Sequence, residues 1–333
     1  KAGEKAEILR MKDEFARNID YLRISVTDRC NLRCVYCMPE EGVDCASHDD
    51  ILRYDEILRI CRGLTGLGIR KVKLTGGEPL VRKDLPWLAA RLKRLEGIEK
   101  VTLTTNGILL PQYMDELKKA GIDGINISLD TLDPGLFEQI TRRDRLKEVK
   151  EGIEAAYRSG IPLKINCVPL GNAKQDLMEV AALARERKIH VRFIEMMPIG
   201  YGKQFTFLGE GEILQMLEDG FGAVQPCGEQ LGNGPCHYYS LPGFCGKIGF
   251  ISAISHKFCS GCNRIRLTSQ GFLKACLQYE TGCDLRKLLR SGASDEVILQ
   301  AAEEVILKKP KGHQFLEREI REEESHSMAQ IGG

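Results

Sequence analysis

Residues 30–37 read Cys30-Asn31-Leu32-Arg33-Cys34-Val35-Tyr36-Cys37, and they directly follow an apolar, strand-like run at residues 21–26. Three thiolates this close together can hold one metal centre. A closed structural zinc site takes four protein ligands, and no fourth Cys or His stands at zinc-ribbon spacing from this C-x3-C-x2-C triplet. The triplet therefore predicts a metal centre that keeps one coordination position open.

An open position suits a 4Fe-4S cluster whose fourth iron binds a substrate, because clusters that only carry electrons are normally held by four cysteines. The triplet, with the aromatic Tyr36 before its last cysteine, resembles the signature of the radical S-adenosylmethionine (SAM) enzymes. The resemblance implies that SAM binds the open iron and is cleaved reductively to a 5′-deoxyadenosyl radical. A zinc site or a chance cluster of thiols is the alternative.

Composition narrows the class of protein. The chain has 333 residues, of which 43% are hydrophobic, enough for one large or two medium domains. The 48 Lys and Arg nearly balance the 47 Asp and Glu, so neither a nucleic-acid partner nor a membrane surface is expected. Thirteen cysteines behind a charged segment, residues 1–18, indicate metal ligands or reduced thiols in a cytoplasmic enzyme. The first residue is Lys1, which leaves open an upstream start and a removed targeting segment.

A β-rich run followed by a helical pattern recurs between residues 20 and 200, which predicts six parallel βα units. Between the first two runs, apolar residues of 54–64 recur at helical spacing, and Gly66 and Gly68 are expected to stop that helix. The predicted strands are Tyr21 to Val26, Lys71 to Thr75, Val101 to Thr105, Gly124 to Leu129, Leu163 to Val168 and Val191 to Glu195.

Six βα units make either an open doubly wound sheet or an incomplete barrel, and both place active sites at the carboxyl ends of the strands. The resemblance to radical SAM enzymes implies the second, an α/β partial (β/α)6 barrel. After residue 200, Gly-rich loops and short strands predict a smaller C-terminal iron-sulfur domain. We therefore expect domains at residues 1–200 and 201–333, with the charged stretch 317–324 as a solvated helix face.

Gly76-Gly77-Glu78-Pro79 follows the second predicted strand. Two small residues allow close approach of a ligand to the backbone, and the carboxylate can accept from an ammonium group. Alone, the stretch would also fit a tight βα turn. The radical SAM resemblance implies that it holds the methionyl amine of SAM. By the same resemblance the cofactor is lined by Tyr36, Gly77, Ser128 and Met197.

A second cysteine group, Cys259-Ser260-Gly261-Cys262 followed by Cys276, again supplies three thiolates. Cys283 could complete an ordinary zinc or four-cysteine site, which is the alternative. In Asn263-Arg264-Ile265-Arg266, strand alternation places Arg264 and Arg266 on one face, where two guanidinium groups suit a polyanion such as phosphate. Two exposed arginines would be the simpler interpretation.

Taken together, both cysteine triplets, the Gly-Gly-Glu-Pro stretch, the paired arginines and the terminal Gly332-Gly333 resemble the molybdenum cofactor biosynthesis protein A family of GTP cyclases, from residue 21 onward. The resemblance implies two 4Fe-4S clusters, one on Cys30, Cys34 and Cys37, and one on Cys259, Cys262 and Cys276 that faces the guanine of GTP. It implies that Gly332 and Gly333 reach into the active site and act in catalysis. It further implies that GTP is contacted by Arg23, Lys73, Thr104, Lys164, Arg264, Ile265 and Arg266.

By this resemblance, Lys73 stands where many members of the family carry arginine. Lysine keeps the positive charge but cannot form the two parallel hydrogen bonds to phosphate that arginine forms. The remaining cysteines are then not ligands: Cys45, Cys61, Cys167, Cys227, Cys236, Cys245 and Cys283. The histidines His190, His237 and His256 are expected to be structural.

The resemblance also implies the reaction and its partners. The 5′-deoxyadenosyl radical takes the C3′ hydrogen of the ribose, and GTP becomes 3′,8-cyclo-7,8-dihydro-GTP, in the first step of molybdenum cofactor biosynthesis. A reductant such as flavodoxin or ferredoxin, cyclic pyranopterin monophosphate synthase as the next enzyme, and a homodimer belong to the same expectation. The alternatives are a two-cluster peptide-modifying maturase and a non-catalytic iron-sulfur or zinc scaffold.

Overall fold

Six parallel strands form the centre of the fold in the computed structural model, which describes residues 11–171, 174–317, 324 and 326–332. They pair side by side in chain order. All six predicted strands are confirmed to within two residues at each end. The strands are β1 (Tyr21–Ser25), β2 (Lys71–Thr75), β3 (Lys100–Thr105), β4 (Gly124–Ser128), β5 (Leu163–Cys167) and β6 (Ile189–Ile194).

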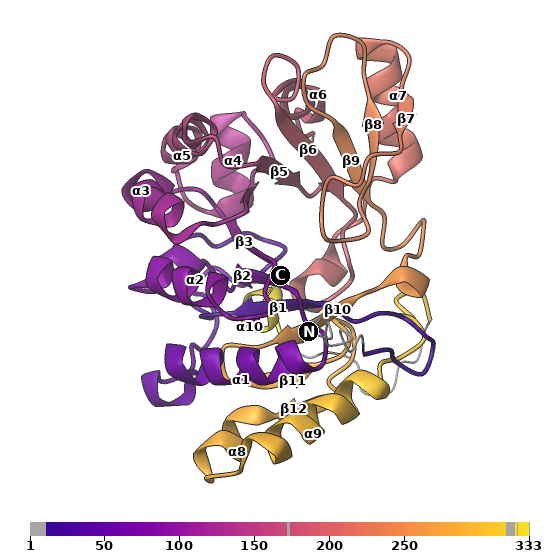
Figure 1. Cartoon of the computed structure of the whole chain (residues 1–333). Helices are drawn as coiled ribbons and strands as arrows, with labels where there is room; N and C mark the ends of the chain where they lie inside the picture. The colour runs from indigo at the N-terminus through magenta and orange to yellow at the C-terminus, as the bar shows by residue number, and fades with distance from the viewer. Residues whose placement is uncertain (1–10, 172–173, 318–323, 325, 333) are drawn as a thin grey trace, which may run out of the picture.

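Helices that follow these strands cover the outer side of the sheet (Figure 1). The helix predicted at residues 54–64 is confirmed, and its apolar stripe, including Ile57, Ile60 and Leu64, is buried. No described helix combines the length and the apolar composition needed to cross a membrane. The helices of this layer are α1 (Tyr54–Gly66), α2 (Leu85–Lys93), α3 (Leu110–Ala120), α4 (Pro134–Thr141), α5 (Leu146–Ser159) and α6 (Leu177–Ala182).

The later strands extend both edges of the same sheet. Strand β9 pairs parallel with β6, and β10 pairs parallel with β1, which gives the order β12-β11-β10-β1-β2-β3-β4-β5-β6-β9-β8-β7. The predicted α/β fold with a C-terminal part is confirmed, while the division at residue 200 stays a prediction. These elements are α7 (Glu210–Phe221), β7 (Gln225–Cys227), β8 (His237–Ser240), β9 (Ile248–Ile251), β10 (Arg264–Leu267), β11 (Phe272–Lys274), β12 (Gly282–Asp284), α8 (Leu285–Arg290), α9 (Asp295–Leu307) and α10 (Met328–Ile331).

The loop at residues 252–263 crosses the open side of the sheet. It joins β9 to β10, which are consecutive in the chain but lie at opposite edges of the parallel strands (Figure 1). A partial barrel has a gap between its first and last strands, so a segment with these end points must span that gap. The loop carries Cys259 and Cys262. Because β10 runs parallel to β1 and Arg264 is opposite Tyr21, the topology brings the second triplet to the amino end of β1, whereas the first triplet follows its carboxyl end.

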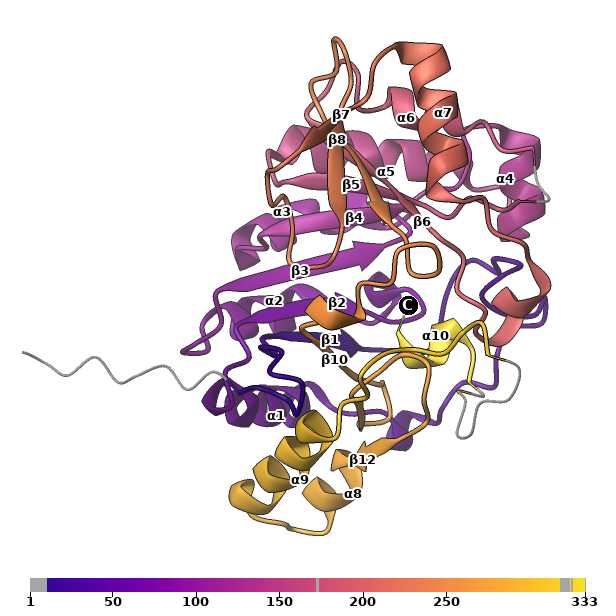
Figure 2. The same ribbon diagram turned by 90° about the vertical axis from the view of Figure 1, so that its right-hand side faces the viewer.

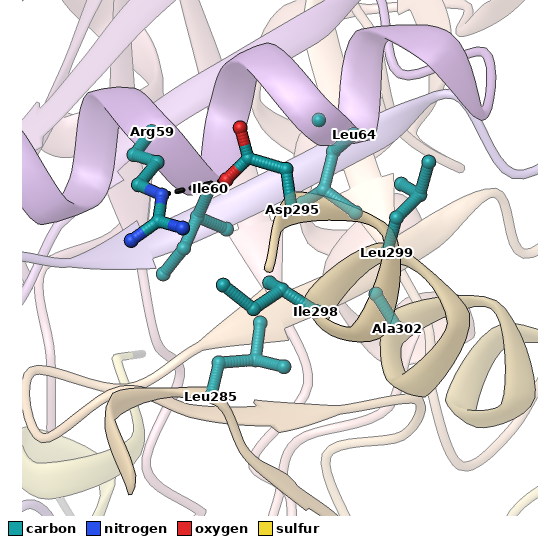
Figure 3. Close-up of a pocket in the computed structure, with 9 residues that line it drawn as sticks. Arg59, Ile60, Leu64, Leu285, Asp295, Ile298, Leu299 and Ala302 are labelled. Carbon is teal, nitrogen blue, oxygen red and sulfur yellow. Dashed lines mark hydrogen bonds and ion pairs between the residues drawn. The ribbon is translucent and has the colours of Figure 1, made fainter. Parts of the chain in front are cut away.

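Helix α9 packs against α1, and a small apolar cavity lies between them (Figure 3). Its volume is about 20 Å³, and Ile60 and Ile298 are among the side chains that line it. An ion pair between Arg59 Nε and Asp295 Oδ1, at 2.6 Å, lies beside it. Ligand sites usually measure hundreds of Å³. This cavity is therefore a packing defect between two helices, rather than a binding site.

Two glycines inside helices should respond oppositely to the same substitution. A Cβ at Gly63 would meet Leu299 Cδ1 at 3.7 Å, whereas a Cβ at Gly152 would lie 2.0 Å from the Gly107 carbonyl oxygen. We expect Gly63→Ala to raise the free energy of unfolding by about 1 kcal/mol, because glycine costs that much inside a helix. Gly152→Ala should lower it by about 3 kcal/mol, because the backbone must move. Denaturant unfolding measures both, and equal shifts would contradict the packing described.

Candidate active site

The first cysteine triplet lies in the loop that leaves the carboxyl end of β1. Its turn is closed by the Cys37 and Met38 amides, which donate to the Cys34 carbonyl oxygen at 2.9 and 3.1 Å. Arg142 Nη1 donates to the Arg33 and Met38 carbonyl oxygens at 3.1 and 3.0 Å and holds the loop from outside. Burial, together with the charge of Cys30, raises the pKa of the Cys37 thiol to about 12. Without a metal these thiols are protonated, so a bound cation is needed to hold them as thiolates.

Gly76 and Gly77 let the β2 turn pass directly against this loop. The Gly77 amide donates to the Thr27 carbonyl oxygen at 2.7 Å, and the Glu78 amide donates to the Arg29 carbonyl oxygen at 2.8 Å. A Cβ at Gly77 would lie 2.4 Å from the Arg29 carbonyl oxygen. The glycine pair is thus required by backbone contact with the cysteine loop.

Glu78 is buried and its carboxylate already has three donors from the protein. Oε1 accepts from the Leu80 amide at 3.0 Å and the Thr105 hydroxyl at 2.7 Å, and Oε2 accepts from the Asn106 amide at 2.6 Å. Burial raises its pKa to about 7, and these hydrogen bonds oppose the rise. A carboxylate offers about four acceptor positions. Glu78 therefore links the carboxyl ends of β2 and β3, as a structural turn residue would. About one acceptor position of its carboxylate is left for an ammonium group.

The residues predicted to line SAM stand at the carboxyl ends of the strands. Gly77 follows β2, Ser128 ends β4, and Met197 follows β6. The Tyr36 hydroxyl donates to Asp130 Oδ2 at 2.6 Å, and Asp130 Oδ1 accepts from the Val168 amide at 2.8 Å. Burial raises the Asp130 pKa to about 6. The fold thus places these four residues along the carboxyl ends of the strands, the end from which the first triplet also leaves β1, and their contact with SAM stays a prediction.

Positively charged side chains form a row across the neighbouring strands. Arg23 in β1 is directly opposite Arg266 in β10 and Lys73 in β2. Burial, together with the charges of Arg264 and Arg192, lowers the pKa of Arg23 to about 10. Burial and neighbouring cations also lower the pKa of Lys73 and Arg266 well below their usual values, and that of Lys164 to about 8. Like charges held together in a buried site favour a bound polyanion.

Three polar residues of this site were not predicted from the sequence: Arg192, Asn126 and Asn166. Arg192 in β6 donates from Nη2 to Asn126 Oδ1 at 2.7 Å and from Nε to Asn166 Oδ1 at 2.9 Å. Asn126 also donates to the Thr104 hydroxyl at 3.3 Å, which connects a predicted GTP residue to this network. Each is a polar residue inside an otherwise apolar strand, and that local signal could have identified them.

The second triplet has a different charge environment. Burial opposes ionisation of Cys262, but Arg264 and Lys309 hold its pKa at about 6. The Arg264 guanidinium lies over the Phe258 ring, 4.9 Å from its centroid. Cys283 is in β12 opposite Leu273, and the charges that act on it come from Asp284 and Glu304. These surroundings differ from those of Cys262, which favours three ligands from the second triplet and leaves the role of Cys283 a prediction.

The carboxyl-terminal tail, with α10, lies beside β1 and β10 (Figure 2). Arg266 Nη1 donates to the Gly332 carbonyl oxygen at 2.6 Å. A Cβ at Gly332 would lie 3.0 Å from Ser25 Cβ, so the tail reaches the carboxyl end of β1. The backbone of Ala329 in α10 lies against the Cys37 sulfur and opposes the rise of its pKa. Gly332 therefore contacts both the first strand and a strand of the second triplet.

Some expectations receive less support or lie outside the described residues. Gly333 and most of the charged stretch 317–324 lie outside them. The Ile265 side chain is fully buried in the core, so only its main chain could contact GTP. Cys61 and Cys167 are buried in the apolar core, and His190 accepts from the Lys247 amide at 3.0 Å. His237 Nε2 and the Glu210 carboxylate are 2.6 Å apart, and His256 Nδ1 lies 3.4 Å from that carboxylate.

Comparison with known proteins identifies the family. Residues 24–184 match the Radical SAM superfamily, and residues 189–315 match the family described as Molybdenum Cofactor Synthesis C. A GTP 3′,8-cyclase of Heliobacterium modesticaldum is 46% identical over 330 residues, which are 97% of this chain and 100% of that protein. One of Clostridium perfringens is 44% identical over 324 residues, with the same coverage. The chain belongs to the GTP 3′,8-cyclase family.

The fold of this GTP 3′,8-cyclase family member is also similar to that of solved structures. Streptococcus suis SuiB bound to precursor peptide SuiA has a TM-score of 0.61 at 15% identity, over 90% of this chain and 67% of that one. SuiB bound to S-adenosylmethionine has a TM-score of 0.60 at 17% identity, over 86% and 68%. The predicted radical SAM enzyme class is confirmed, together with its SAM and iron-sulfur cofactors.

The spacing of the sulfur atoms tests whether the triplets suit such cofactors. Thiolates on a single zinc ion, each about 2.3 Å from the metal, would lie roughly 4 Å apart. Among the described residues, three potential ligand atoms lie within 4.8 Å of one another only in Glu280, Glu324 and His326. Neither cysteine triplet is that compact. Both therefore fit a larger iron-sulfur cluster, as a GTP 3′,8-cyclase family member requires, better than one zinc ion.

Proposed function

We propose that this protein converts GTP to 3′,8-cyclo-7,8-dihydro-GTP, the first step of molybdenum cofactor biosynthesis. The observation that carries the proposal is the row of buried cations between the two cysteine triplets. Arg23, Lys73 and Arg266 stand side by side on neighbouring strands, and burial together with neighbouring cations lowers the pKa of each of them. The triphosphate of a nucleotide would bring several negative charges to this row, and arginine suits bidentate contact with phosphate.

The residues divide the work of binding and orientation. Cys30, Cys34 and Cys37 would hold the first cluster with SAM, lined by Tyr36, Gly77, Ser128 and Met197. When bound, this pair supplies the 5′-deoxyadenosyl radical that takes the C3′ hydrogen of the ribose. Cys259, Cys262 and Cys276 would hold the second cluster and present it to the guanine.

The phosphates of GTP would lie on the cation row. Arg23, Lys73 and Arg266 form its centre, and Arg264 and Lys164 extend it. Thr104 contributes a hydroxyl, while Ile265 could contribute only its main chain. Because the radical reaction needs no side-chain acid and base, the protein mainly fixes the ribose relative to the guanine and excludes competing reactions. Gly332 and Gly333 would close this site from the tail.

The partners follow from the same chemistry. One-electron reduction of a cluster requires an outside donor, for which we propose a flavodoxin or ferredoxin. The product would pass to cyclic pyranopterin monophosphate synthase, and a homodimer fits the proposal as well. All thirteen cysteines are free thiols, which supports a reducing cytoplasm as the compartment.

Anaerobic turnover of the reconstituted protein tests the function. The reaction contains SAM and dithionite, with and without GTP, and chromatography with mass detection follows 5′-deoxyadenosine and nucleotides. We expect GTP-dependent 5′-deoxyadenosine and a new nucleotide that keeps the mass of GTP but elutes apart from it. GTP-independent 5′-deoxyadenosine with unchanged nucleotide would redirect the proposal to a peptide substrate. If no 5′-deoxyadenosine forms, a non-catalytic scaffold is the better description.

The affinity for GTP should fall above about pH 8. Burial and the charge of Arg192 lower the pKa of Lys164 to about 8, and Cys236 opposes the shift. Below that pH the ammonium is already charged, whereas above it GTP must bind together with a proton, so Kd rises by up to about tenfold per pH unit. Equilibrium dialysis between pH 7 and 9.5 measures this. Lys164→Met should flatten the profile, and identical profiles in the two proteins would exclude Lys164 as the titrating group.

A further inference from the structure

One short segment, residues 309–312, lies against the whole second triplet. Lys309 Nζ donates to the Arg264 carbonyl oxygen at 2.8 Å and to the Ala275 carbonyl oxygen, and Ala275 directly precedes Cys276. At the other end of the segment, a Cβ at Gly312 would lie 3.5 Å from the Cys259 sulfur. The segment thus touches the strands and loops that carry all three cysteines.

Among the described residues, Cys262 and Cys276 are the groups whose negative charge favours the Lys309 ammonium. Its side chain is 3% exposed, and no carboxylate of the described residues lies within ion-pair distance of it. Burial lowers its pKa, and Cys262 and Cys276 are the groups that oppose this change. A buried ammonium without a counter-ion is costly. The anionic partner that this site provides is therefore the second triplet.

A clamp from the amino-terminal segment fixes the position of Lys309. Arg17 Nη2 donates to the carbonyl oxygens of Lys309 and Pro310 at 3.2 and 2.7 Å, and Nη1 donates to those of Lys311 and Cys259 at 2.9 to 3.1 Å. Arg17 Nε is paired with Asp13 Oδ2 at 2.6 Å, and both side chains are buried. Four hydrogen bonds from one guanidinium, three to the segment and one to Cys259, tie the segment to a cysteine of the triplet. Lys309 cannot move away without breaking them.

We propose that Lys309 is a positioning residue that serves as the fixed counter-charge of the second cluster and raises its reduction potential. This inference rests on the proposed function in one respect, namely that the second triplet holds a cluster. Reduction adds one negative charge to a cluster, and a buried ammonium beside two of its thiolates stabilises the reduced form more than the oxidised form. Net charge, hydrogen bonds and solvent exposure are the factors that set such potentials.

The test measures the potential of the second cluster by itself. Cys30, Cys34 and Cys37 are replaced with alanine, so that the only cluster signal comes from the second triplet. Iron content is then determined, and dithionite titration is followed by electron paramagnetic resonance. We expect Lys309→Met to reduce the equilibrium constant for one-electron reduction at least tenfold, which corresponds to a potential lower by about 59 mV. Lys309→Arg, which keeps the charge, should stay within threefold of the parent.

Lys308→Met is the matched control. Lys308 is the neighbouring residue, its side chain is 75% exposed, and it lies 3.7 Å from Glu304. The Lys308→Met substitution should leave the reduction potential of the second cluster unchanged. A Lys309→Met protein that loads iron fully and has the parent's potential would overturn the inference, and so would an arginine variant that fails as the methionine variant does. Loss of iron from Lys309→Met alone would support it, because the charge is then needed to hold the cluster.

Failure of the proposed function gives a different pattern. If the parent with only its second triplet binds no iron, both the inference and the second cluster are wrong. If the cluster forms and its potential depends on Lys309, but intact protein makes no nucleotide product, the inference stands and the GTP assignment fails.

Discussion

Gly332→Ala should reduce formation of the cyclised nucleotide at least tenfold while iron content stays unchanged. Gly332 has φ of 77°, where alanine is strained. An added Cβ would lie 3.0 Å from Ser25 Cβ and 3.2 Å from Thr75 Cγ2, at the ends of two central strands. The tail must shift to relieve these contacts, which removes the Gly332 carbonyl oxygen from Arg266 Nη1. Displacement of a positioned group by about 1 Å can cost about a hundredfold in rate.

Gly160→Ala provides a control with the same backbone strain. Gly160 also has φ of 77°, at the end of α5, and nothing lies within 4 Å of its added Cβ. It should lose about 1 kcal/mol of stability and keep full turnover. Anaerobic product yield and unfolding midpoints compare the two variants, and deletion of residues 332–333 should match or exceed the loss in Gly332→Ala. Full product from the truncated chain would show that the tail has no part in catalysis.

Local sequence patterns predict the central fold well. The six strands and helix α1 begin and end at turn-forming residues, and their apolar residues recur at regular spacing. Both signals depend on residues only a few positions apart, so the bounds of these elements can be predicted from the sequence. The cysteine triplets are visible for the same reason. In β2, alternation places Lys71 and Lys73 on one face, but only the structure separates them: Lys71 pairs with Asp20 at 2.7 Å, whereas Lys73 is buried beside Arg23.

Contacts between distant segments could not be predicted. Arg17 lies 242 residues from Cys259 and 292 from Lys309, and no periodic pattern links them. The run Lys309-Pro310-Lys311-Gly312 has the composition of an exposed turn, yet Lys309 is almost fully buried. Its burial depends on β9 and β10 joining opposite edges of the sheet, which brings the second triplet to the amino end of β1. Strand order, rather than propensity, decides this part of the site.

Arg266→Met should weaken GTP binding roughly 30-fold or more without destabilising the ligand-free protein. One charge-assisted hydrogen bond is worth about 2 kcal/mol, and each 1.4 kcal/mol changes affinity tenfold. Burial, then Arg23 and Arg264, lower the pKa of Arg266 well below its usual value, so its charge is unfavourable when the site is empty. Methionine fills similar space without charge. Binding by equilibrium dialysis and thermal unfolding of ligand-free protein measure the two effects.

Arg59→Met is the control for the loss of an arginine away from this site. Arg59 pairs with Asp295 near the surface, and its loss should leave GTP affinity unchanged. Combining Arg266→Met with a chain that ends at Ile331 separates the two contacts of Arg266. If Arg266 binds the phosphates directly, the affinity loss persists in the shortened chain. If Arg266 acts only by holding the Gly332 carbonyl oxygen, truncation alone already causes that loss and the substitution adds nothing. We expect the first result, because Arg266 lies in the cation row opposite Arg23 whether or not the tail is present.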